Sequence, residues 1–280
     1  MSPETSPPRP VPLHPVMPRP YVADPPAIIA LPLRALRKVG QYVLFMWDFF
    51  NAARRTRPLP GRVVEEAYRI GVQSLPILAV ISAFIGTNLA IQGYQGFKPL
   101  GGQGLVGMFV AMAGVRELGP IIAASMVAAK AGTEMASQIG VMRIREQIDA
   151  LEVMAVNPYA WLVTPRLMGI LVVMPALTVL AVFVMVASGY MVAVYQLGLN
   201  GFEYLQYATD NVRALDFAYA IIKAFIFGTI ICTVSCFFGF TCGKGPVGVG
   251  VATNRAVVVS AVLCVFINYF ISEALYGGLG

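Results

Sequence analysis

Long apolar runs constrain this chain more than any other feature of its sequence. They cover about residues 75–94, 105–140, 167–194, 217–240 and 256–276. A helix rises ~1.5 Å per residue, so about 20 apolar residues cross the ~30 Å hydrocarbon core of a bilayer. The runs are continuous rather than alternating, which indicates helices and not the strands of a β-barrel. The sequence therefore predicts five membrane crossings.

The composition agrees with a membrane location. Hydrophobic residues make up 58% of the chain and charged residues only 12%, about half the charged share of a typical soluble domain. The net charge of +6 does not indicate a nucleic-acid partner, because the basic residues gather beside the apolar runs, where they orient helices and contact anionic lipid. We expect an all-α polytopic membrane protein.

Two segments precede the first apolar run. Residues 1–27 contain 10 of the 20 prolines and no apolar period, which predicts a disordered tail and leaves residues 28–280 as one membrane domain. Residues 31–53 are amphipathic, with charge recurring along one face only, so we expect a helix lying in the membrane interface. Its apolar side consists of Leu36, Val39, Val43, Met46, Trp47 and Phe50.

The second apolar run contains charged residues that need an explanation. Arg116 and Glu117 are adjacent, and Lys130 and Glu134 are four residues apart. Pro120 lacks a backbone donor and predicts a break or kink in the helix. Ionisable residues within a membrane are costly and usually face a cavity or a partner. The two pairs therefore indicate either a translocation pathway or links that hold the bundle together.

A short charged island at residues 142–158 separates the second and third runs. It predicts an amphipathic helix of about three turns, which Asn157 and Pro158 end. This helix either lies on the membrane surface or docks a cytosolic partner. Its apolar stripe would consist of Ile144, Ile148, Leu151 and Ala155, and its acidic face of Glu146, Asp149 and Glu152.

The distribution of basic residues predicts the orientation. Residues 34–69 contain eight Lys and Arg, and five more flank loops on the same side of the membrane, whereas the opposite loops contain only Lys98 and Arg213. By the positive-inside rule, the N-terminus, the charged island and the Gly-rich loop 243–250 are cytoplasmic, and the C-terminus lies on the other side.

Nothing in the sequence predicts catalysis by this chain. The only histidine, His14, lies in the proline-rich tail. Residues 239–245 superficially resemble a phosphate-binding loop, but the spacing is one residue short and Gly245 stands where Ser or Thr would hold magnesium. The four cysteines lie in or beside apolar runs without a set of metal ligands around them. We expect no catalytic residue, metal or cofactor here.

Beyond these patterns, six segments together match one known family: residues 116–120, 132–133, 139–142, 146–158, 165–166 and 248–258. With these segments the chain resembles the MlaE/YrbE permease family over roughly residues 31–277. The resemblance implies that residues 28–280 form the permease domain of an ABC-type lipid transporter. Such permeases have an N-terminal interfacial helix, five transmembrane helices and a cytoplasmic coupling helix.

The resemblance also implies partners and sites. The permease would lie in the inner, cytoplasmic membrane as a dimer. It would bind two cytosolic ABC ATPases, which carry ATP and magnesium, and work with MCE-domain proteins. The substrate would be a phospholipid, fatty acid or sterol. Arg116 and Glu117, with Leu89 nearby, match positions near the lipid cavity between two permease subunits. Matches to the coupling helix are Glu146, Gln147, Asp149, Leu151 and Glu152.

The sequence departs from the family pattern at Lys130, Glu134, Gln138 and Asn268, where an Arg, a small residue, a Glu and an Asp are usual. These departures favour a heterodimer with a second, paralogous permease, as in actinobacterial Mce complexes. Two other functions remain open. An ion-driven secondary transporter, with a relay through Lys130, Glu134 and Glu117, would work without an ATPase and would have inverted repeats, which the sequence does not show. A membrane scaffold would tolerate mutations in the cavity.

Overall fold

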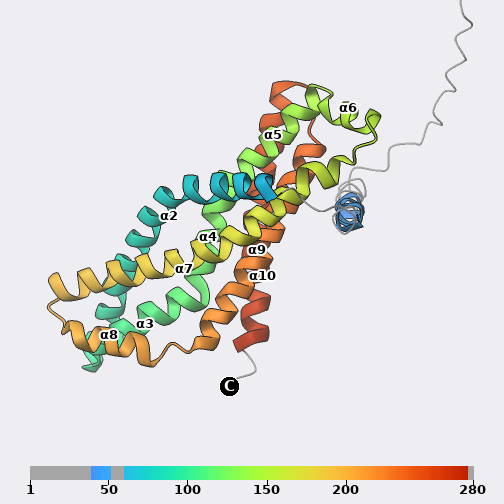
Figure 1. Ribbon diagram of the computed structural model, residues 1–280. Helices are drawn as coiled ribbons and strands as arrows, with labels where there is room; N and C mark the ends of the chain where they lie inside the picture. Colours follow the sequence, from blue (N-terminus) through green and yellow to red (C-terminus); the bar gives the residue numbers. More distant parts are fainter. Residues whose placement is uncertain (1–38, 52–59, 277–280) are drawn as a thin grey trace, which may run out of the picture. The chain divides into compact units, whose positions relative to one another are not determined.

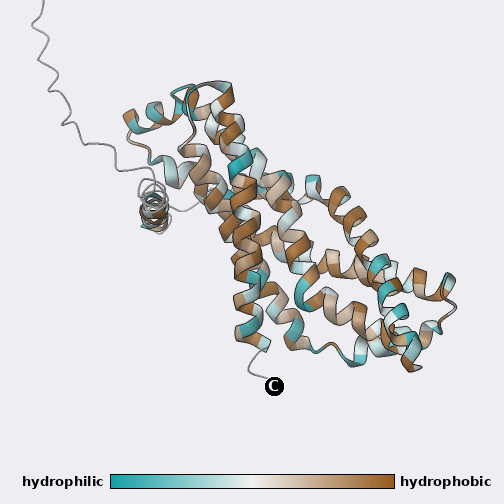
Figure 2. Ribbon diagram, turned by 180° about the vertical axis from the view of Figure 1, so that it is seen from behind, coloured by the Kyte–Doolittle hydropathy of each residue, from teal (hydrophilic) through white to brown (hydrophobic). Residues whose placement is uncertain are grey.

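The computed structural model describes residues 39–51 and 60–276, and all regular secondary structure in that part of the chain is helical. Five helical stretches are long and apolar enough to cross a membrane, so the predicted all-α polytopic membrane fold is confirmed. The proline-rich tail and residues 31–38 lie outside the described residues. Hydrophobic residues cover much of the spanning helices (Figure 2).

The first and third spanning helices pack along one another. They are α2 (Pro60–Phe97) and α7 (Thr164–Tyr195), side by side in Figure 1. A Cβ on Gly86 of α2 would collide with the carbonyl oxygen of Met185 on α7, so only glycine permits this close approach. The sequence placed the start of the first span near residue 75, but α2 is one continuous helix that begins at Pro60, so it is longer at its N-terminal end than the apolar run.

The second spanning stretch is continuous, so of the break or kink predicted at Pro120 only a bend is present. It contains α3 (Val106–Ala113), α4 (Gly119–Val127) and α5 (Thr133–Ile144), joined by the π-helical turns η3 (Gly114–Leu118) and η4 (Ala128–Gly132). The path bends between α3 and α4 (Figure 1). Pro120 is the second residue of α4, and because it directly follows the π turn η3, its missing N–H leaves a carbonyl of the preceding turn without its helical donor.

The polar residues of segment 198–216 predict a loop between the third and fourth apolar runs, but a helix lies within this segment. It is α8 (Gly201–Asp210). Two short 3-10 turns, η1 (Lys98–Leu100) and η2 (Gln103–Leu105), lie much earlier in the chain, between α2 and α3. The Asn200 side chain caps α8 by accepting a hydrogen bond from the Phe202 backbone N–H at 3.0 Å, which stabilises a helix start. Tyr204 is buried against α3 and α7, and its burial raises the pKa of its phenol.

The last two spanning helices differ in their packing. They are α9 (Ala214–Phe240) and α10 (Gly245–Tyr276). In the apolar segment of α9, 61% of the residues are buried within this chain, whereas in the apolar segment of α10 only 17% are buried. The Gly-rich segment 243–250 was expected to be a loop, but α10 already begins at Gly245, whose φ of 82° suits glycine. α10 therefore presents most of its apolar surface outward from this chain.

The helix over residues 39–51 packs against the bundle with a side other than the predicted apolar side. Phe45 and Phe49 are buried, and the Phe45 ring packs 5.5 Å from Tyr159 and 5.7 Å from Phe237. The Tyr42 hydroxyl hydrogen-bonds Thr233 at 2.8 Å, and burial raises the Tyr42 pKa. The predicted apolar side is exposed at Val43, Trp47 and Phe50. An exposed apolar side is the arrangement that a helix in a membrane interface requires.

Candidate functional site

The first predicted site, Arg116 and Glu117, lies in the π turn η3. Arg116 is paired with Asp216 of α9 and not with the adjacent Glu117. Arg116 Nε donates to Asp216 Oδ1 at 3.0 Å, and the guanidinium lies 5.0 Å from the centre of the Tyr276 ring. Asp216 is only 4% exposed. Adjacent residues on a helix point about 100° apart, so Arg116 turns toward α9 while Glu117 is exposed. Among the described residues, Glu117 has no ion-pair partner.

Asp216 is a residue that sequence reasoning missed, because it ends the segment interpreted as a loop. It occupies the first turn of α9, and its Oδ2 accepts a hydrogen bond from the Arg213 backbone N–H at 3.0 Å. An acidic residue near a helix N-terminus satisfies free backbone donors and interacts favourably with the helix dipole. An aspartate three residues after the N-cap, here Arg213, is therefore the signal that could have identified it.

Lys223 completes this cluster from the middle of the bundle. Its side chain is fully buried, and Nζ donates to the Arg116 carbonyl oxygen and to Ser272 Oγ, both at 2.7 Å. In an α-helix that carbonyl would accept from the N–H of residue 120, which Pro120 lacks. Lys223 supplies the missing donor. The cluster of Arg116, Asp216 and Lys223 therefore joins η3, α9 and α10.

Leu89 packs against apolar residues and not against this charged cluster. It is half-buried on α2 and packs against two buried apolar clusters, one of which includes Val110 and Tyr204. Such packing is what any core leucine has, so within one chain Leu89, Arg116 and Glu117 do not form a single site. Their role at a cavity between two permease subunits stays a prediction.

The predicted pair of Lys130 and Glu134 is not formed. Lys130 is exposed in η4, while Glu134 Oε1 lies 3.6 Å from Arg69 Nε on α2 and accepts from Gln138 Nε2 at 3.0 Å. Gln138 Oε1 in turn accepts from the buried Arg166 of α7 at 2.8 Å. These bonds join α2, α5 and α7, which supports the interpretation that the polar residues here hold the bundle together.

The charged island forms a shorter helix than expected. α5 ends at Ile144, and α6 (Gln147–Val153) is about two turns long instead of three. Glu146 adopts a left-handed φ of 57°, and so does Ala155 at 59°, which ends regular helix on both sides. Ile144 and Ala155 are therefore not part of the apolar stripe, and Glu146 precedes the helix rather than belonging to its acidic face.

α6 is anchored mainly by Ile148, and most of its other residues are exposed. Ile148 is buried and Leu151 is half-buried, whereas Glu146, Gln147, Asp149 and Glu152 are exposed. Asp149 also pairs with the partly exposed Arg143 at 2.6 Å. Val153, the last residue of α6, is 88% exposed, and Met154 directly after it is 63% exposed. α6 thus carries an exposed acidic surface that ends in an apolar tip, while its function as a coupling helix stays a prediction.

Five helices able to span a bilayer, with charged groups paired inside the bundle, define a polytopic helical membrane protein. The chain belongs to the MlaE permease family, since the family described as Permease MlaE matches residues 63–274.

Three relatives illustrate the range of this similarity. A probable ABC transporter permease protein of Rickettsia felis is 34% identical over 244 residues, covering 87% of this chain and 94% of the relative. Protein TRIGALACTOSYLDIACYLGLYCEROL 1, chloroplastic, of Arabidopsis thaliana is 33% identical over 231 residues, with coverage of 80% and 65%. The intermembrane phospholipid transport system permease protein MlaE of Haemophilus influenzae is 29% identical over 216 residues, with coverage of 77% and 83%.

Proposed function

We propose that this chain is the transmembrane permease subunit of an ABC-type Mce lipid transporter, which moves a phospholipid, fatty acid or sterol across the inner membrane and cell envelope. The observation that carries the proposal is the family match over residues 63–274, together with relatives named as ABC transporter permeases and as a phospholipid transport permease. The N-terminus would be cytoplasmic and the C-terminus periplasmic, as the basic residues indicate.

In this proposal a separate cytosolic ABC ATPase holds ATP and magnesium and binds α6. The exposed acidic residues and the apolar tip at Val153 and Met154 suit a protein interface with an apolar centre and a polar rim. Only Arg145 and Glu146 separate α6 from α5. A movement of α6 would therefore be transmitted along the 42-residue helical stretch that contains both π turns.

The lipid would bind between this chain and a second permease subunit, most simply a paralogue, and MCE-domain proteins would receive or deliver it. The poorly buried surface of α10 suits contact with another membrane helix. Glu117 is exposed in η3 and available to a lipid headgroup, whereas Arg116 is already paired with Asp216. A wide apolar cavity with few polar groups is what a lipid requires.

Affinity capture of the chain from its native membrane, followed by mass spectrometry of proteins and lipid, tests the proposal. We expect an ABC ATPase, a second permease of different sequence, MCE-domain proteins and a lipid. Capture of the chain without an ATPase would contradict it.

Reconstituted vesicles then separate the two alternative functions. Transfer of labelled lipid should require ATP and the ATPase. Ion-driven transfer without the ATPase would indicate a secondary transporter. An intact complex without any transfer would indicate a scaffold.

A further inference from the structure

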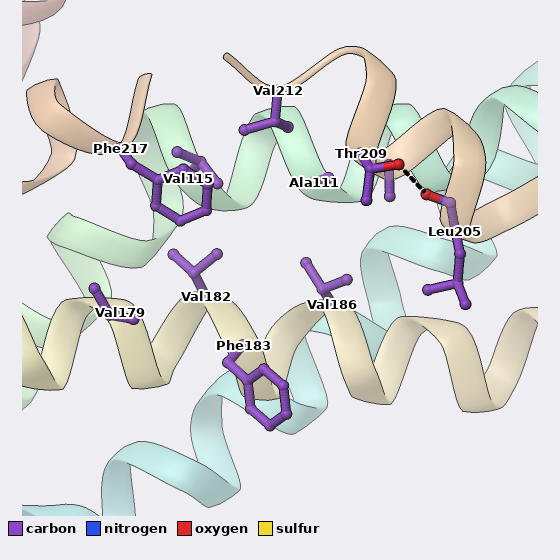
Figure 3. Close-up of a pocket in the computed structure, with 11 residues that line it drawn as sticks. Ala111, Val115, Val179, Val182, Phe183, Val186, Leu205, Thr209, Val212 and Phe217 are labelled. Atoms are coloured by element: carbon purple, nitrogen blue, oxygen red, sulfur yellow. Dashed lines mark hydrogen bonds between the residues drawn. The ribbon is translucent and has the colours of Figure 1, made fainter. Parts of the chain in front are cut away.

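A cavity of about 450 Å³ lies within this chain, away from the sites that the sequence indicated (Figure 3). Its four walls come from α3 with the adjoining turn η3, from α7, from α8 and from the beginning of α9. They are represented by Ala111, Val115, Val182, Leu205 and Phe217. This volume falls within the ~300–1,000 Å³ typical of small-molecule sites. Arg116, Glu117 and Leu89 are not among its lining residues.

The lining is almost entirely apolar. Ten of its eleven residues have hydrocarbon side chains, and the exception is Thr209. The Thr209 hydroxyl donates to the carbonyl oxygens of Leu205 at 3.0 Å and Gln206 at 3.1 Å, within its own helix. A polar ligand would lose its hydration here without gaining partners, which is costly. A hydrocarbon ligand would bury apolar surface at no such cost.

The surroundings indicate where such a ligand comes from. Three of the four walls, α3, α7 and α9, belong to stretches able to span a membrane. Phe183, Leu205 and Phe217 at the lining are exposed, so the cavity opens at an apolar surface among these helices. In a bilayer this surface faces lipid tails, which are therefore the hydrocarbon closest to the opening.

We propose that this cavity binds one acyl chain of a bilayer lipid, held between α7 and α8. The site belongs to a single chain and needs neither an ATPase nor a second permease, so it is independent of the proposed transport. One end of the cavity is tied to the charged cluster, because Val115 and Phe217 directly adjoin the paired residues Arg116 and Asp216. The ion pair thereby holds two walls of the cavity together.

Photolabelling in lipid nanodiscs tests this site. The full chain is reconstituted in phosphatidylcholine with a small share of phosphatidylcholine that carries a diazirine within one acyl chain, and labelled peptides are identified by mass spectrometry. We expect labelling to concentrate on residues 179–186 and 205–217, above the level on the outward-facing Val258 and Val262 of α10. Equal labelling of all apolar surfaces would overturn the proposal.

Two variants on α7 provide a matched comparison. Val186→Trp fills the cavity, whereas Val172→Trp makes the same change at a position that is 67% exposed and does not line it. Labelling of the cavity peptides should fall about tenfold in Val186→Trp, which corresponds to ~1.4 kcal/mol, and remain unchanged in Val172→Trp. Unchanged labelling in Val186→Trp would contradict the proposal.

Ala208→Leu on α8 provides an independent and smaller filling of the cavity. It should lower the same labelling by a smaller factor. If thermal unfolding measurements show that Val186→Trp is not folded, the labelling of Ala208→Leu decides whether the cavity binds the acyl chain. Because no arm of this experiment measures transport, a negative result here leaves the proposed function untouched, and the reverse also holds.

Discussion

The two charged regions of this molecule, α6 and the cluster around Arg116, use their charges in opposite ways. Around Arg116, the guanidinium is paired with Asp216, and the buried Lys223 satisfies a carbonyl group. On α6, the acidic side chains are exposed, and the pair of Arg143 and Asp149 is about half exposed on each side. The comparison teaches that charge in a membrane protein has to be judged by its partners rather than by its place in the sequence.

The energetic consequences differ accordingly. Breaking a buried pair leaves one charge without compensation and destabilises the fold. An exposed pair contributes at most ~1 kcal/mol, because water screens it. We therefore expect changes around Arg116 to act on folding and changes on α6 to act on binding.

The largest effect should come from reversing the charges of α6. Glu146→Lys, Asp149→Lys and Glu152→Lys together should abolish co-purification of the proposed ATPase, since like charges facing each other at an interface cost several kcal/mol. Thermal unfolding of the permease should change little. The matched control reverses the exposed Glu203 and Asp210 of α8. Unchanged co-purification of the ATPase with the triple variant would remove the docking function of α6.

The next effect concerns the ion pair of the Arg116 cluster. Asp216→Ala removes the partner of Arg116, which would cost ~3–5 kcal/mol for a fully buried pair. Because the Arg116 side chain is 33% exposed, we expect a smaller loss of stability, on the order of 2 kcal/mol. Denaturation in detergent measures it, with Asp210→Ala on the surface of α8 as the control. Equal stability of the two variants would show that water replaces Asp216.

A double variant tests why Lys223 is buried. Lys223→Met leaves the Arg116 carbonyl without a donor and should cost about 1–3 kcal/mol. Pro120→Ala restores a backbone N–H four residues after Arg116 and should recover part of that loss, on the order of 1 kcal/mol. Stability measurements on both single variants and the double variant give the coupling. Strict additivity would contradict our account of this carbonyl group.

The smallest effect on stability should come from Glu117→Ala. Glu117 is exposed within this chain, so its loss should change the unfolding free energy by less than about 0.5 kcal/mol. If the residue faces lipid at the proposed subunit interface, transfer of labelled lipid should nevertheless fail while the complex still assembles. Complex yield and transport are measured together. Normal transport would exclude a lipid-contacting role, and collapse of the complex would indicate a structural one.

The sequence by itself determined the five spanning helices, because the hydropathy of consecutive residues decides whether a segment crosses a bilayer. It also predicted a helix in the charged island and an acidic face on that helix, and Asp149 and Glu152 of α6 are indeed exposed. It did not reveal the left-handed Glu146 that shortens α6, since a glutamate has no marked preference for that conformation and the turn follows from how α5 ends.

Only the tertiary structure decided the partners. Asp216 lies 100 residues from Arg116, and Lys223 lies 107 residues from it, and no local pattern relates positions so far apart. The same holds for Tyr204 of α8, which is buried against α3, and for the cavity, where Ala111 and Val115 meet α7 and α8 from a distant segment of the chain. Periodicity shows which side of a helix is apolar, but the close approaches at residues such as Gly86 decide which helix that side meets.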